Sequence, residues 1–85
     1  MTDQMSLVRA ATFAEFAAKL RAFAARQEEK APGRMDHIVG PAVAAANLAT
    51  LASAAYENGD KDAAKALRAE YTSIIAANTF LNGVA

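Results

Sequence analysis

The chain has 85 residues and a mass of 8.9 kDa, the size of one small domain. Nine basic and nine acidic residues cancel to a net charge of zero, so the chain lacks the overall positive charge of a general nucleic-acid binder. It contains no cysteine, which excludes disulfides and thiolate metal sites. Alanine fills 24 positions, and because alanine has the highest helix propensity, this composition predicts an all-α fold.

Residues 1–11 are expected to form an N-terminal arm or a short helix. Met1, Met5 and Val8 would share one helical face, which we expect to tuck against the body of the domain. The segment carries Asp3 and Arg9 and has no long apolar run, so it does not resemble a secretory signal. We therefore expect a cytoplasmic protein.

A first long helix is predicted over residues 12–30. Thr12 precedes Glu15 by three residues, which is the capping-box pattern at a helix N-terminus. Apolar residues then recur at spacings of three, four and three and predict one buried seam: Phe13, Phe16, Leu20 and Phe23. The breaker Ala31-Pro32-Gly33 should end this helix.

Two further helices are predicted over residues 35–57 and 60–82. The first of them either kinks at Gly40-Pro41 or begins there, since proline is tolerated best in a first turn. Asn58-Gly59 supplies a left-handed stop, and Asp60 caps the next helix. The last helix has an apolar seam at helical spacing: Ala64, Leu67, Tyr71, Ile74, Asn78 and Leu81.

The short connections predict a small three-helix up-down-up bundle with a short N-terminal arm or helix. Around the second connection, Leu51-Ala52, Tyr56, Gly59-Asp60 and Ala64 resemble one tetratricopeptide hairpin over about 30 residues. The resemblance implies a tight helical hairpin. A single hairpin without stacked copies does not imply membership of that repeat family.

Residues with catalytic or metal-binding potential are sparse. His37 is the only histidine, and no nucleophile is indicated beside it. Glu28 and Glu29 are adjacent, so on a helix they point about 100° apart and do not converge. We expect no catalytic residue, no metal site and no cofactor.

The second predicted helix carries no charge from Ile38 to Tyr56. Leu48, Leu51 and Ala55 predict its core seam. The opposite side is lined by small residues, and we expect either that a partner docks there or that the other two helices cover it. The partner-binding candidates on this side are Ala42, Val43, Ala46, Ala49, Thr50 and Ser53. The stretch is mostly alanine, interrupted by polar residues, so we expect no membrane span.

Phe80 is a further partner-binding candidate, because on a helix that reaches residue 80 it lies opposite the apolar seam. Lys19, Arg26 and Lys30 lie on one side of the first long helix and form a basic strip. In one interpretation this strip binds a nucleic acid. We favour the other interpretation, in which these long side chains extend over the edge of the apolar seam or pair with acidic residues.

The leading functional hypothesis is a small protein–protein interaction module, an adaptor or a stoichiometric inhibitor without catalysis. Small inhibitors encoded by phages and mobile elements share this profile. The first alternative is a structural homo-oligomer, such as a homodimer, formed through the second helix. The other is a nucleic-acid-binding accessory protein that uses the basic strip.

Overall fold

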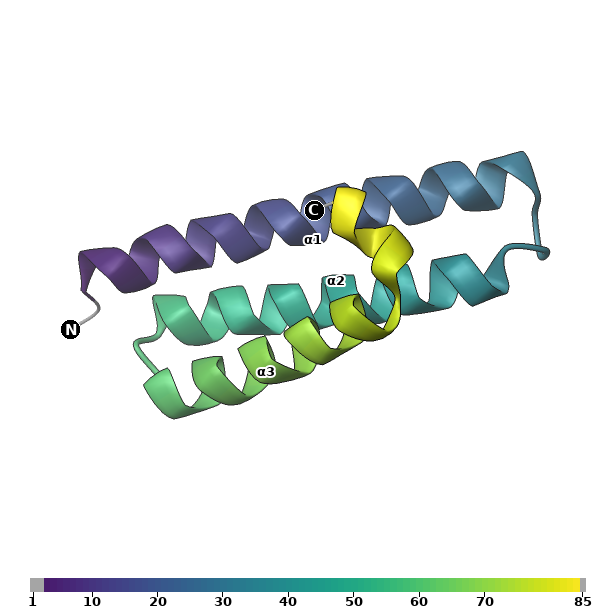
Figure 1. Ribbon diagram of the computed structural model, residues 1–85. Helices are drawn as coiled ribbons and strands as arrows, with labels where there is room; N and C mark the ends of the chain where they lie inside the picture. The colour runs from purple at the N-terminus through teal and green to yellow at the C-terminus, as the bar shows by residue number, and fades with distance from the viewer. Residues whose placement is uncertain (1–2, 85) are drawn as a thin grey trace.

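The computed structural model describes residues 3–84, which form three α-helices and one 3-10 helix. The helices are α1 (Gln4–Lys30), α2 (Asp36–Glu57), α3 (Lys61–Ala77) and the 3-10 helix η1 (Thr79–Gly83). Figure 1 shows α2 lying between α1 and α3, with neighbouring helices antiparallel. No strand occurs among the described residues. The predicted all-α class and the up-down-up three-helix bundle are therefore confirmed.

The first helix begins at Gln4, so the predicted arm or short helix over residues 1–11 and the capping box at Thr12 are wrong. The cap is Asp3, whose Oδ1 accepts a hydrogen bond from the Ser6 N–H at 2.7 Å. Thr12 lies inside α1, and its hydroxyl donates to the Val8 carbonyl oxygen at 3.0 Å. The segment before Thr12 contains neither glycine nor proline, so nothing interrupts the helix there.

The first turns of α1 were predicted to pack against the body of the domain, and this prediction is also wrong. Met5 and Val8 are more than half exposed and do not tuck against the body. Met1 lies outside the described residues.

The second helix runs without a break through Pro41, so it starts at Asp36 and not at the proline. Pro41 lacks an N–H for the His37 carbonyl, but His37 lies in the exposed first turn, where water can satisfy that oxygen. The predicted stop after α2 is confirmed, because Gly59 has a φ of 72°.

The third helix starts as predicted and ends earlier than predicted. Its cap is Asp60, whose Oδ1 accepts from the Ala63 N–H at 3.1 Å. It ends at Ala77, where the Asn78 side chain donates to the Ile74 carbonyl oxygen at 2.9 Å. The chain then turns into η1, which places Leu81 in the core with no exposed surface.

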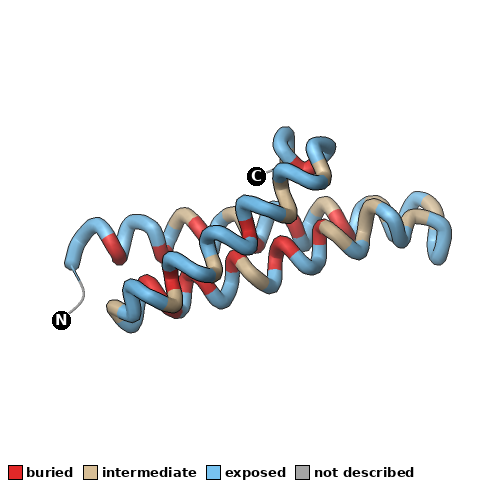
Figure 2. Tube along the Cα trace, turned by 60° about the horizontal axis from the view of Figure 1, so that its bottom comes forward, coloured by how far each residue is buried: buried red, intermediate tan, exposed pale blue. Residues whose placement is uncertain are grey.

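The core between α1 and α2 consists mostly of small side chains. Figure 2 shows in red where the buried residues lie along the helices. The buried residues of α1 alternate at spacings of four and three: Ser6, Ala10, Phe13, Ala17, Leu20 and Ala24. They meet a matching row on α2: Ala42, Ala46, Ala49, Ser53 and Tyr56. The Ser53 hydroxyl donates to the Ala10 carbonyl oxygen at 2.7 Å, a bond that links the two helices. Small residues at these positions let the two helices pack closely.

By length and composition, α2 is the one helix among residues 3–84 that would suffice to cross a membrane. The central helix of a soluble bundle passes the same test. Here α2 packs along both α1 and α3, which cover its buried residues.

Candidate functional site

An open groove runs between α1 and α3, above α2. Both helices pack along α2, whereas their own backbones hardly approach each other. Two neighbouring hollows lie in this space and share Arg9, Tyr56 and Arg68. They therefore form one continuous depression, which we call the α1–α3 groove.

Aromatic side chains from all three helices form the floor of the groove. The rings of Phe13 and Tyr56 stack with centroids 5.8 Å apart, and Phe13 meets Tyr71 edge-on at 5.4 Å. The Phe16 ring stacks on Tyr71 at 6.0 Å and lies edge-on to Phe13 at 5.6 Å. Phe13, Tyr56 and Tyr71 are buried, while Phe16 keeps part of its surface exposed. Burial raises the pKa of Tyr71 above its ordinary value.

Basic side chains form the rim of the groove. Arg9 extends from α1, and its Cζ lies 5.9 Å from the centroid of the Tyr56 ring, a cation–π contact. Lys61, Lys65 and Arg68 extend from α3. Within residues 3–84, no carboxylate forms an ion pair with Lys65, Arg68 or Arg9. The rim therefore carries positive charge that the bundle does not neutralise by contact.

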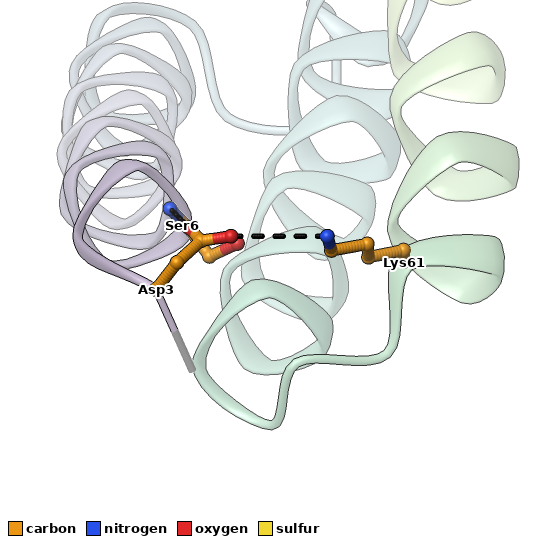
Figure 3. Close-up of polar contacts among 3 residues, drawn as sticks. All are labelled: Asp3, Ser6 and Lys61. Atoms are coloured by element: carbon orange, nitrogen blue, oxygen red, sulfur yellow. Dashed lines mark hydrogen bonds and ion pairs between the residues drawn. The ribbon is translucent and has the colours of Figure 1, made fainter. Parts of the chain in front are cut away.

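One acidic residue, Asp3, lines the groove. It lies beside Lys61, near the N-terminal ends of α1 and α3 (Figure 3). Its Oδ2 is 3.8 Å from the Lys61 Nζ, so this weak ion pair joins the N-terminal ends of α1 and α3. The hydrogen bond from the Ser6 N–H holds the pKa of Asp3 below its ordinary value, and the charges of Lys61 and Arg9 add to that effect. Asp3 thus stays ionised. Its carboxylate both caps α1 and forms an ion pair with Lys61 of α3.

The face of α2 that is lined by small residues, where a partner was predicted to dock, is buried inside the bundle. Ala42, Ala46 and Ala49 are 0% exposed and Ser53 is buried, because α1 packs over them. The prediction that these four residues bind a partner is therefore wrong, and the alternative of internal coverage is confirmed. The predicted core seam is wrong at Leu51, which is 54% exposed.

Two of the predicted partner-binding residues on α2 do face solvent. Val43 is exposed beyond the edge of the α1–α2 interface. Thr50 is exposed as well, and its Oγ1 accepts a hydrogen bond from the Arg21 guanidinium at 3.0 Å. The same guanidinium donates to the Asn47 side-chain oxygen at 3.2 Å, so α1 partly covers this face of α2.

Phe80 lies on η1 and not on the outer face of α3, because α3 ends before it. It is 43% exposed and lines a shallow hollow together with Phe23, Lys19 and Arg26. The structure therefore brings one predicted protein-binding residue beside two residues of the predicted basic strip. Lys19 also pairs with Glu15 at 3.2 Å within α1, whereas Lys30, the third residue of the strip, does not line this hollow.

The four basic residues of the groove rim were not among the residues predicted to bind a partner. A signal for three of them is present, because Lys61, Lys65 and Arg68 are spaced by four and three and share one helical face. They are also all the basic residues of the chain after Arg34. No local pattern could have added Arg9, since the fold alone brings α1 alongside α3.

The residues that were considered for catalysis or metal binding, His37, Glu28 and Glu29, do not form a common site. His37 is exposed at the start of α2, and the Glu28 carboxylate accepts from the Gly33 N–H at 3.0 Å. Residues 3–84 contain no group of three histidine, cysteine or acidic side chains placed to hold a metal ion. No protein-family model, curated protein or solved structure matches the chain.

Proposed function

We propose that this chain is a helical interaction module that binds another protein through the α1–α3 groove, acting as an adaptor or a stoichiometric inhibitor without catalysis of its own. The observation that carries the proposal is the groove itself, in which Lys65 and Arg68 lie beside an aromatic floor and have no ion-pair partner among residues 3–84. A concave surface with an apolar base and a charged rim combines apolar burial with electrostatic steering.

The experiment compares three tagged forms of the chain in cells of its source. Lys65→Glu combined with Arg68→Glu reverses the groove rim on exposed residues of α3. Lys30→Glu combined with Arg34→Glu makes the same charge change at the exposed connection between α1 and α2. Circular dichroism checks that both variants keep the helical fold, and quantitative mass spectrometry identifies the proteins that each form retains.

We expect the parent and the connection variant to retain the same partner, and the groove variant to lose it. Equal recovery by all three forms, or no specific recovery by the parent, contradicts the proposal. Loss from the connection variant alone would favour a site near Lys30 instead. A shift of the parent from monomer to dimer in sedimentation velocity, without a second protein, would favour the homo-oligomer.

A further inference from the structure

We infer that the α1–α3 groove receives an acidic amphipathic helix of about three turns, which completes a four-helix bundle. This inference rests on the proposed function and adds the chemistry of the partner segment. It is carried by the shape of the groove, its apolar floor and its uneven charge.

The groove has the form of a missing helix position. In Figure 1, α1 and α3 run in the same direction on either side of α2. The Asp3–Lys61 pair spans one end of the space between them. At the other end the chain leaves α3 through η1. Phe80 of η1 and Val84, the residue after it, line one hollow together with Phe23 of α1. The basic and aromatic lining on α3 extends from Lys61 to Thr72, which is about 17 Å at 1.5 Å per residue, or about three helical turns.

The floor favours an apolar helix face as the occupant. Phe16 is partly exposed over the stacked ring of Tyr71, and Met5 on the α1 wall is 59% exposed. Met5 and Phe16 are about 17 Å apart along α1 at 1.5 Å per residue, so a helix with apolar residues at positions i, i+3 or i+4, i+7 and i+11 would cover both side chains along one stripe. Burial of Phe16 and Met5 would remove apolar surface that the three helices leave in water.

The rim selects the charge of the occupant. The groove is lined by Arg9, Lys61, Lys65 and Arg68 against one carboxylate, that of Asp3. Because the whole chain is neutral, the rest of the molecule carries an excess of acidic residues. The positive charge is therefore concentrated at the groove, and Asp or Glu side chains flanking the apolar stripe of an incoming helix would pair with it.

A nucleic acid matches the groove less well than a helix does. Single strands bind through successive bases stacked on accessible aromatic faces. On the floor of the groove Phe13, Tyr56 and Tyr71 are buried, and Phe16 alone among these four keeps part of its surface exposed. Duplex DNA is read by elements that protrude into its grooves, whereas these cations line a depression between helices.

A second copy of the chain does not offer the required face either. A helix that follows the groove for about three turns would need an acidic residue on each turn beside its apolar stripe. None of α1, α2 and α3 has this pattern. The acidic residues are scattered or adjacent instead, as Glu28 and Glu29 are at the end of α1. The occupant is therefore a segment of a different protein.

A displayed library of random 16-residue peptides tests the inference even while the partner is unidentified. The library is selected on the immobilised full chain, and enriched peptides are synthesised and titrated by fluorescence anisotropy. We expect acidic peptides with apolar residues at helical spacing, which gain helicity on binding. The Lys65→Glu, Arg68→Glu variant should weaken them about tenfold or more, and Lys30→Glu, Arg34→Glu should not.

Several results would overturn the inference. They are the absence of enrichment, enrichment of neutral or basic peptides, equal binding by the groove variant, and equal binding of a scrambled peptide of the same composition. Tighter binding of a labelled single-stranded oligonucleotide than of any peptide would assign the groove to nucleic acid. If the cell experiment finds a groove-dependent partner while the library yields no acidic helix, the proposed function stands and this inference falls.

Discussion

Replacing Ala49 with glutamate tests whether α1 closes the small-residue face of α2. Ala49 is 0% exposed at that interface. Burial raises the pKa of a glutamate by about 3–5 units, so a glutamate at this position would be mostly protonated at pH 7. Its neutralisation costs about 3–4 kcal/mol, which is ~1.4 kcal/mol for each of the roughly 2.7 units between its ordinary pKa and pH 7. The extra side-chain volume costs a further ~1–3 kcal/mol. An 85-residue domain has a total stability of only about 4–13 kcal/mol, so Ala49→Glu should largely unfold it.

Circular dichroism and urea denaturation measure this effect against two matched variants. Leu51→Glu places the same charge two residues away on a side chain that is 54% exposed, and it should leave the unfolding midpoint nearly unchanged. Ala49→Leu adds volume without charge and should cost only ~1–3 kcal/mol, which separates the packing cost from the charge cost. If Ala49→Glu unfolds at the same urea concentration as the parent, α1 does not cover Ala49 and the arrangement of α1 on α2 is wrong.

Two further predictions concern η1 and the groove floor. Leu81→Ala should lower the free energy of unfolding by about 2–5 kcal/mol because Leu81 is fully buried, whereas Phe80→Ser should cost clearly less; equal costs in urea denaturation would contradict the placement of η1. In a Tyr56→Phe background, ultraviolet absorbance of tyrosinate should show Tyr71 ionising above its ordinary pKa of 10.0 in the folded chain and near that value in urea. Because its folded-state pKa is raised, the stability linked to Tyr71 is fully present below pH 10.0 and is lost as the pH rises through the folded-state pKa; identical titrations in both states would contradict its burial.

Helix ends were predictable where the signal lies within a few residues. The Asp60 cap and the left-handed Gly59 depend on local backbone geometry, and both are found as predicted. The Thr12 start failed because a capping pattern begins a helix only when the preceding residues are not already helical, and here α1 is capped earlier, at Asp3. The predicted length of α3 failed because burial of Leu81 against the core, a tertiary effect, competes with continuation of the helix.

The faces of α2 could not be assigned from hydrophobicity alone. Leu51 is larger and more apolar than Ala49, so its position predicts the core, yet Leu51 is exposed and Ala49 is buried. The outcome depends on what α1 presents, since Ala10 and Ala17 approach α2 closely only if the facing residues are also small. The groove could not be predicted from the sequence for the same reason. Arg9 of α1 lies near the basic residues of α3 only because both helices pack against α2.

Binding of the proposed partner helix to the floor of the groove would also stabilise the bundle. The backbones of α1 and α3 hardly meet, and these helices are linked by the rings of Phe13 and Phe16 against Tyr71 and by the Asp3–Lys61 ion pair. The α1–α2 interface is built mainly of alanine, which buries little apolar area per residue. A helix seated over Phe16 would touch both α1 and α3, and only the assembled bundle presents that surface. A partner that binds only the folded chain would stabilise it by RT ln(1 + [L]/Kd). The groove residues that set the Kd of the proposed helix would therefore also set how much stability it contributes.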